Sequence, residues 1–204
     1  MNKIRILILA GGEGTRLKPL TNHMPKVMVP IHGKPFLYYM LKWLKNHDIV
    51  MSVGYKSESI RSWCKENKIA IELVREPEPL GTGGALRICK PFVENCKKFA
   101  VINGDTYVDC SIEKIVKKYS GKPLVVNAKS VLDGIVRPAG IYILDKSVFK
   151  YLGRPKMFNL DERMQCVDRD TYTISKKYLD IGTHEGLKYA KCSNIFMGKI
   201  WNEE

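Results

Sequence analysis

The sequence predicts an α/β fold in which helices flank a mainly parallel, mixed sheet. Short apolar runs that are typical of buried strands alternate with segments whose apolar residues recur at helical spacing, and this alternation holds through the first two thirds of the chain. The chain has 204 residues, of which 45% are hydrophobic and 27% charged, so it is long enough to enclose one substantial core. We therefore expect a single domain that spans residues 1–204.

Each element is predicted from its own local pattern. Runs of apolar and β-branched residues predict strands at residues 4–9, 49–53, 69–74, 99–102, 124–128, 140–144, 171–174 and 177–179. Apolar residues at helical spacing predict helices at residues 36–46, 57–67, 82–89, 111–119, 158–165 and 185–192. Sheets of this kind bind ligands beyond the carboxyl ends of their strands, so the loops that follow strands are the places to look for a site.

A glycine-rich loop follows the first predicted strand. Residues 9–26 read LAGGEGTRLKPLTNHMPK, with glycine at positions 11, 12 and 14 and fixed positive charge at Arg16 and Lys26. Glycine lets a backbone turn sharply and approach a ligand closely, and successive backbone N–H groups form a concavity that binds anions. The loop therefore predicts a polyphosphate site. The alternative, a tight turn without a ligand, does not account for the two basic residues.

The spacing of these glycines excludes two commoner nucleotide motifs. A dinucleotide-binding fingerprint that began at Gly12 and Gly14 would need its third glycine where Leu17 stands. A P-loop needs Gly-Lys followed by Ser or Thr, whereas the Gly-Lys pair at positions 33–34 is followed by Pro35. The loop at residues 9–26 therefore belongs to neither class.

Two aspartates stand where predicted strands end. Asp105 closes the run AVINGD at residues 100–105, and Asp180 follows an apolar strand and precedes a glycine. A carboxylate in such a position suits magnesium, which prefers one or two carboxylates together with phosphate oxygens and water. The alternative is that either aspartate caps a turn, as aspartate commonly does. The four histidines show no metal-ligand spacing, and we expect them in loops or at the surface.

The composition limits the partners of the protein. The net charge of +13 suits anionic substrates, but the basic residues are spread along the chain and form no zinc-finger, RNA-recognition or helix-turn-helix signature, so we expect no nucleic acid. The six cysteines form no C-x-x-C pair, and the chain shows neither a signal-peptide core nor an apolar stretch long enough to span a membrane. A reducing cytoplasm is the expected location.

Several motifs occur in the order in which a known family carries them. They are GGEGTR at residues 11–16, Pro25-Lys26, KPFL at 34–37, VGY at 53–55, EPLGTGGA at 78–85, NGD at 103–105 and LDIGT at 179–183. Together they span most of the chain and resemble the sugar-1-phosphate nucleotidyltransferases. Within that family, the form of residues 80–85 is most similar to the D-glycero-D-manno-heptose 1-phosphate guanylyltransferase group.

The resemblance implies a fold and a division of labour along the chain. The fold would be the Rossmann-like nucleotidyltransferase fold. Residues 1–110 would bind the nucleotide and residues 111–204 the sugar phosphate.

The resemblance also assigns roles to single residues. Arg16 and Lys26 would be catalytic, and Asp105 and Asp180 would bind magnesium. The nucleotide would be bound by Leu9, Ala10, Gly11, Gly12, Gly14, Thr15, Gly81, Thr82, Gly83, Asn103 and Gly104. For the glycines at 81–84, the alternative is a helix start chosen for close packing. Gly140 and Tyr142 would bind the sugar phosphate.

The chain departs from the family before the predicted strand at residues 140–144. Relatives usually carry a Glu-Lys-Pro segment there that contacts sugar and phosphate, whereas residues 129–138 read KSVLDGIVRP. Arg137 is our candidate for the missing positive charge in sugar-phosphate binding. The shortened segment implies a more open acceptor pocket, or an acceptor other than a standard hexose.

The implied reaction is magnesium-dependent transfer of a nucleotidyl group from a nucleoside triphosphate to a sugar 1-phosphate, with release of pyrophosphate. The overall resemblance favours GTP and a heptose 1-phosphate. The alternatives are a uridylyl-, cytidylyl- or thymidylyltransferase for another phosphate, and a nucleotide-sensing domain without activity. A metal-dependent glycosyltransferase would be expected to show an Asp-x-Asp pair, which residues 105–107 lack. The sequence leaves the oligomeric state open, with a homodimer as one option.

Overall fold

The computed structural model describes residues 3–153 and 155–196 of the chain. The strands are β1 (Arg5–Ala10), β2 (Pro30–Ile31), β3 (Lys34–Pro35), β4 (Asp48–Val53), β5 (Glu72–Arg75), β6 (Phe99–Asn103), β7 (Thr106–Val108), β8 (Leu124–Ser130), β9 (Val136–Leu144) and β10 (Asp170–Asp180). The α-helices are α1 (Phe36–Trp43), α2 (Ser57–Glu66), α3 (Gly81–Ile88), α4 (Lys90–Val93), α5 (Ile112–Val116), α6 (Leu160–Gln165) and α7 (His184–Cys192). Short 3-10 helices are η1 (Thr15–Leu17), η2 (Leu20–Asn22), η3 (Lys26–Met28) and η4 (Lys146–Lys150).

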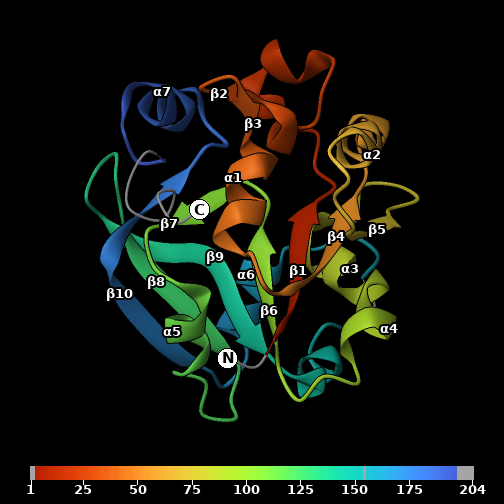
Figure 1. Ribbon diagram of the computed structural model, residues 1–204. Coiled ribbons are helices and arrows are strands. Elements are labelled where there is room, and N and C mark those ends of the chain that lie inside the picture. The colour runs from red at the N-terminus through yellow and green to blue at the C-terminus, as the bar shows by residue number, and fades with distance from the viewer. Residues whose placement is uncertain (1–2, 154, 197–204) are drawn as a thin grey trace.

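A curled, eight-stranded mixed sheet forms the centre of the molecule, with strand order β5-β4-β1-β6-β9-β8-β10-β7 (Figure 1). Within the described residues, four of its seven neighbouring strand pairs are parallel and three are antiparallel. The predicted mainly parallel, mixed sheet is therefore confirmed. Strands β2 and β3 form a separate small hairpin.

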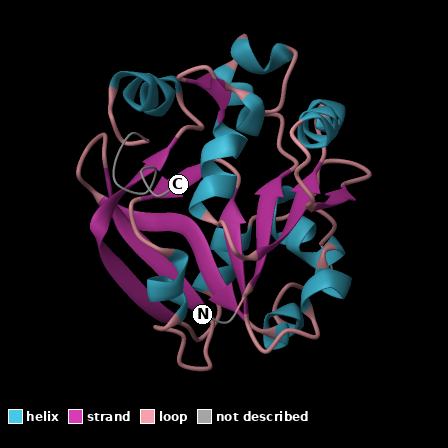
Figure 2. Ribbon diagram, in the orientation of Figure 1, coloured by secondary structure: helices cyan, strands magenta, loops and turns pink. Residues whose placement is uncertain are grey.

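Helices cover both faces of the sheet (Figure 2). Helices α1, α2, α5 and α7 pack on one face, and α3, α4 and α6 on the other. Strand β1 serves both cores, because Ile6 and Ile8 belong to one and Leu7 and Leu9 to the other. This explains its unbroken apolar sequence, which is typical of a strand buried on both faces. No helix in the described part of the chain has the length and apolar character to cross a membrane.

The strand directions bring three sequence segments to one edge of the sheet. β1 and β6 are parallel neighbours in which Leu9 lies opposite Asn103, so the loops that follow them lie side by side. β6 is antiparallel to β9, β9 is antiparallel to β8, and β8 is parallel to β10. β10 therefore also ends at this edge, which is the upper edge in Figure 1. The glycine-rich loop and Asp105, each of which follows a predicted strand, therefore share an edge.

The predicted types of element are confirmed, but some of their bounds differ. The helix predicted at residues 36–46 ends at Trp43, and Asn46 adopts a left-handed conformation with φ of 74°. Two predicted strands are one strand, β10, whose pairing with β8 shifts register after Ile174. β2, β3, β7 and α4 were not predicted, because elements of two to four residues are too short to show a period.

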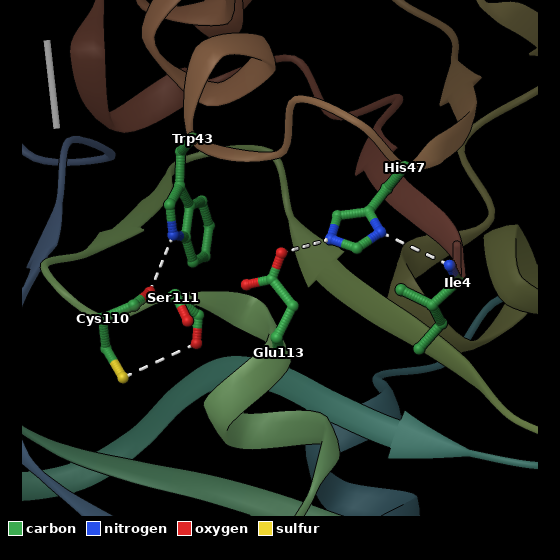
Figure 3. Close-up of polar contacts among 6 residues, drawn as sticks. All are labelled: Ile4, Trp43, His47, Cys110, Ser111 and Glu113. Carbon is green, nitrogen blue, oxygen red and sulfur yellow. Dashed lines mark hydrogen bonds and ion pairs between the residues drawn. The ribbon is translucent and has the colours of Figure 1, made fainter. Parts of the chain in front are cut away.

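The histidines lie in loops or at the surface, as expected, but the side chain of His47 is buried within its loop. The side chain of His47 is only 3% exposed, with its Nδ1 accepting a hydrogen bond from the Ile4 N–H at 3.3 Å and its Nε2 3.1 Å from Glu113 Oε1 (Figure 3). Because Nδ1 accepts, the proton of the neutral ring lies on Nε2, which donates to Glu113. His47 is therefore a structural contact at the lower edge of the sheet. His23, His32 and His184 are exposed, as expected.

Candidate active site

Buried contacts fix the loop that follows β1. Gly14 has a left-handed φ of 65°, and its carbonyl accepts a hydrogen bond of 2.9 Å from the hydroxyl of Thr21, which is fully buried. A β carbon at position 14 would also lie 3.0 Å from the Thr21 methyl group, so the position requires glycine. Ala10 ends β1 in the core, whereas Thr15 and Arg16 lie exposed in η1, where they are open to a ligand.

The carboxylate of Glu76 packs against Gly11. Glu76 is 7% exposed, and it accepts hydrogen bonds from the Ser52 hydroxyl at 2.6 Å and from the Leu80 N–H at 3.4 Å. A β carbon at Gly11 would lie 1.9 Å from Glu76 Oε1, so only glycine permits this approach. Glu76 therefore ties the glycine-rich loop to the segment that leads into α3. Sequence reasoning missed Glu76 and Ser52, although Glu76 stands two residues before the recognised EPLGTGGA motif.

A cleft of about 350 Å³ opens between the loop after β1 and the segment before α3. Its lining includes five of the predicted nucleotide-binding residues, Leu9, Gly11, Gly12, Gly81 and Thr82. The volume lies at the lower end of the range for small-molecule sites. The structure thus brings the predicted phosphate loop and the predicted base loop to the two walls of one cleft.

The glycines inside α3 are explained by packing. A β carbon at Gly83 would lie 2.0 Å from the Phe158 ring, and one at Gly84 would lie 2.7 Å from the Lys156 carbonyl oxygen. The Gly83 N–H donates to the Phe158 carbonyl at 3.0 Å. The packing alternative therefore accounts for both glycines, and the contact of Gly83 with a nucleobase stays a prediction.

The four predicted charged residues meet around Gly182. A β carbon at Gly182 would lie 2.8 Å from Asp105 Oδ2, 2.8 Å from Asp180 Oδ1 and 3.1 Å from Arg16 Nη2. The Gly182 N–H donates to Asp180 Oδ1 at 2.6 Å, and Lys26 forms a hydrogen-bonded ion pair with Asp105 Oδ2. Gly182 was not a predicted site residue, although it belongs to the LDIGT motif. Its missing side chain is what lets the two carboxylates and the guanidinium approach.

The two carboxylates respond differently to their surroundings. Burial acts to raise the pKa of Asp105, but the Lys26 ammonium and its hydrogen bond, aided by Arg16, hold that pKa below its ordinary value. Burial and the negative charge of Asp105 raise the pKa of Asp180. A cation between the two carboxylates would relieve this repulsion. Among the described residues no third carboxylate, histidine or cysteine joins them, and two carboxylates suffice for magnesium.

The end of β6 packs closely against β1 and β9. The Gly104 N–H donates to the Leu9 carbonyl at 2.8 Å, and a β carbon at Gly104 would lie 2.7 Å from the same oxygen. Gly140 has φ of 65°, and a β carbon there would lie 2.4 Å from Asn103 Nδ2. Asn103 Oδ1 is buried without a hydrogen-bond partner among the described residues, and such an orphaned acceptor is open to a donor from a ligand.

Tyr142 and Arg137 lie in different surroundings on β9. Tyr142 is 1% exposed in the core beneath α6, where its hydroxyl donates to Asp161. Burial, followed by the Asp161 charge, raises the pKa of this hydroxyl. The structure gives Tyr142 a packing role, and its contact with a sugar phosphate stays a prediction.

Arg137 is exposed and forms an ion pair of 2.5 Å with Asp133. Burial raises the pKa of Tyr178, and the Arg137 charge opposes that shift, so Arg137 lies close to Tyr178. Tyr178 and Asp180 share one face of β10 because they are two residues apart. Arg137 therefore lies on the same face of the sheet as Asp180.

The match to known proteins agrees with this geometry. Residues 5–133, which include the glycine-rich loop, the walls of the cleft and Asp105, match the nucleotidyl transferase family. The chain belongs to this family. It is therefore a nucleotidyltransferase, and the enzyme class predicted from the sequence is confirmed.

Members of this family with known names and structures cover most of the chain. A D-glycero-alpha-D-manno-heptose 1-phosphate guanylyltransferase of Campylobacter jejuni is 31% identical over 191 residues, which are 79% of this chain and 85% of that protein. An enzyme of the same name from Aneurinibacillus thermoaerophilus is 37% identical over 119 residues, which are 55% of this chain and 51% of that protein.

The fold is also that of a solved relative. The crystal structure of HddC from Yersinia pseudotuberculosis aligns with a TM-score of 0.79 and 27% identity over 92% of this chain and 97% of that chain. HddC has also been solved in complex with GMP-PN. This likeness confirms the predicted nucleotidyltransferase fold.

Proposed function

We propose that this enzyme transfers a nucleotidyl group from a nucleoside triphosphate to a sugar 1-phosphate and releases pyrophosphate. The observation that carries the proposal is the convergence of Asp105, Asp180, Arg16 and Lys26 at Gly182, next to the loop that lines the cleft. The two cations complement the negative charge of a polyphosphate. The pair of carboxylates can hold a divalent metal, which would add further positive charge. The names of the guanylyltransferase relatives support the same reaction.

The reaction needs positioning and charge neutralisation more than a strong base. The second pKa of a phosphate monoester is about 6, so the acceptor phosphate is largely ionised near neutral pH. One of its oxygens attacks the α-phosphorus of the triphosphate, and the bond to the β-phosphate oxygen breaks. We assign the backbone of residues 11–15 and Arg16 to the β- and γ-phosphates, which leave as pyrophosphate. Lys26 then balances the charge that develops at the α-phosphorus.

We propose magnesium as the metal held by Asp105 and Asp180. Support comes from the two carboxylates, whose oxygens lie together beside Gly182. The pKa of Asp180 is raised by burial and then by the negative charge of Asp105, and a cation between the two carboxylates would relieve that repulsion. Asp105 and Asp180 would hold the ion, which when bound would supply positive charge to neutralise the reacting phosphates. The ion pair between Lys26 and Asp105 keeps Asp105 ionised, as a metal ligand must be.

We propose GTP as the nucleotide. The cleft is lined by Glu76 and Glu78, whose carboxylates accept hydrogen bonds and donate none when ionised. Guanine presents a ring N–H beside an amino group, which is a pair of donors that suits one carboxylate. Glu76→Gln, which keeps the size of the side chain, is expected to lower kcat/KM for GTP about tenfold or more, because a charge-assisted hydrogen bond is lost. An unchanged ratio of GTP to UTP turnover would contradict this assignment.

We propose a heptose 1-phosphate as the acceptor, bound on the side of β9 and β10. Support comes from the relatives' names and from the exposed Arg137, which can pair with a phosphate once it leaves Asp133. Residues 1–110 would then bind the nucleotide and residues 111–204 the sugar phosphate. Asp180 belongs to the second part but lies beside Asp105 of the first. The cytoplasm, which keeps thiols reduced, is the location that we propose for the enzyme.

Pyrophosphate release tests the proposal directly. Each of the four ribonucleoside triphosphates and thymidine triphosphate is mixed with magnesium, the enzyme and either heptose, mannose or glucose 1-phosphate. We expect GTP with heptose 1-phosphate to release pyrophosphate fastest and to yield the nucleotide sugar. Nucleotide binding without pyrophosphate from any pair would favour the sensing domain. Fast turnover of another nucleotide and sugar phosphate would support the proposed reaction but would contradict the proposed substrates.

A further inference from the structure

We propose that a second cavity, at the edge of the sheet opposite the cleft, binds a small phosphate ester with an apolar body. The cavity measures about 550 Å³, compared with about 350 Å³ for the cleft. It lies between the start of β1, the loop that precedes β6, and helix α5, near the N-terminus at the lower edge of Figure 1. None of its lining residues takes part in the proposed reaction, so the inference goes beyond that function.

Positive charge predominates around this cavity. The basic residues that line it are Lys3, Arg5, Lys97, Lys98 and Lys117, and the acidic ones are Asp48 and Glu113. Asp48 is already paired with Lys3 at 3.7 Å, and Lys98 donates to the Val116 carbonyl at 3.3 Å. Arg5, Lys97 and Lys117 form no ion pair or side-chain hydrogen bond with any residue of 3–153 or 155–196. Three cations that form no ion pair within the described residues therefore line one hollow.

The wall of the cavity is fixed by buried hydrogen bonds. His47 links the Ile4 N–H to the Glu113 carboxylate and so joins β1 to α5 (Figure 3). Burial acts to raise the pKa of Glu113, but hydrogen bonds from its own backbone N–H, from Ser111 and from His47 hold that pKa below its ordinary value. The negative charge of Glu113 is thereby directed at donors within the protein. Among the described residues it forms no ion pair with the three cations on the rim.

The lining selects the class of ligand. Ile4, Val116 and Cys96 contribute apolar surface beside the charged rim. A dianionic phosphate group can contact two or more of the cations, while an apolar body covers these side chains. A polymeric nucleic acid would instead need an extended track of positive charge. The cations here line one hollow of about 550 Å³, so we favour a small phosphorylated metabolite.

Binding of phenyl phosphate to the full-length enzyme tests the proposal. Phenyl phosphate is titrated into nitrogen-15-labelled protein at near-physiological salt, and the amide resonances of Ile4, Lys97 and Lys117 are followed by NMR. We expect saturable shifts at these amides. Phenol, which lacks the phosphate, should cause none, and inorganic phosphate, which lacks the apolar body, should bind more weakly.

A pair of double variants separates a built site from general electrostatic attraction. Lys97→Gln with Lys117→Gln is expected to weaken phenyl phosphate binding about tenfold or more, because charged hydrogen-bond donors are lost. Arg61→Gln with Lys65→Gln removes the same charge from exposed positions on α2 and should weaken binding less than about twofold.

Two outcomes would overturn the proposal. The first is equal weakening in both double variants, and the second is an absence of saturable shifts at the lower edge in a folded wild type. Neither outcome bears on the catalytic cleft, because no activity is measured. The proposed reaction therefore stands or falls on the pyrophosphate assay alone.

Discussion

The donor side and the acceptor side of the site are built in different ways. On the donor side, buried Glu76 and fully buried Thr21 fix the glycine-rich loop through Gly11 and Gly14. On the acceptor side, Ile135 in the connection between β8 and β9 is 57% exposed, and Val136, which begins β9, is 52% exposed. The loop proposed to bind the triphosphate is thus preorganised by the core, whereas the segment proposed to bind the acceptor is exposed and has few buried contacts.

The largest expected effect is on the donor side, at Asp105. Asp105→Asn removes one of the two carboxylate charges beside Gly182 and leaves the Lys26 ammonium without its anionic partner. We expect turnover to fall at least about a hundredfold, which is the order of loss for one electrostatic stabiliser, while the fold persists. Steady-state kinetics and circular dichroism measure the two effects. Asp109→Asn changes an exposed aspartate four residues away, and its turnover should match that of the wild type.

A pair of adjacent glycines tests the preorganisation of the donor side. A β carbon at Gly11 would lie 1.9 Å from Glu76 Oε1, whereas one at Gly12 has no heavy atom within 4 Å. Gly11→Ala should therefore lower the free energy of unfolding by about 1–3 kcal/mol, as overpacking does, and raise KM for the triphosphate. Gly12→Ala should leave stability near that of the wild type in thermal or denaturant unfolding. Equal stability of the two variants would argue that the contact with Glu76 does not fix the loop.

A substitution on the acceptor side should change KM for the sugar phosphate and leave the free energy of unfolding nearly unchanged. Arg137 and its partner Asp133 are 42% and 41% exposed, so their ion pair contributes little to folding. Arg137→Ala is expected to raise KM for the sugar phosphate about tenfold, because one charged hydrogen bond to phosphate is lost, and to leave KM for GTP unchanged. Asp133→Asn, which frees Arg137 from its ion pair, should not raise the acceptor KM. An unchanged acceptor KM in Arg137→Ala would remove Arg137 from the site.

The sequence could predict which donor-side residues lie together, because strand order brings strand ends together. The apolar runs before the glycine-rich loop, Asp105 and Asp180 each marked a strand end, and parallel strands place such ends at one edge. The contact between Ser52 and Glu76 was not predictable in this way. It joins residues on two different segments, and only the parallel pairing of β4 with β5 brings those segments side by side.

Side-chain direction is where the sequence was least informative. β9 is buried on both faces near Tyr142, so its sequence lacks the alternation that would show which side chains face a ligand and which face the core. The same limit applies to His47, whose buried ring contacts Glu113 from a helix far along the chain. A single histidine in a loop carries no local signal of such a partner.

The smallest expected effect concerns the edge opposite the cleft, where His47 from residues 1–110 meets Glu113 from residues 111–204. Because the pKa of Glu113 is lowered from 4.5, its contribution to stability is present above about pH 4.5 and is lost as the pH falls through the lowered pKa. Glu113→Gln should therefore reduce the free energy of unfolding by less than about 1 kcal/mol near pH 7, and by less again near pH 3.

Urea unfolding of the wild type and of Glu113→Gln at both pH values measures this difference. Glu66→Gln, an exposed change on α2, serves as the control and should leave stability unaltered at either pH. If Glu113→Gln costs as much near pH 3 as near pH 7, the ionised carboxylate does not stabilise the contact with His47. The two parts of the chain would then be held together at this edge by apolar packing.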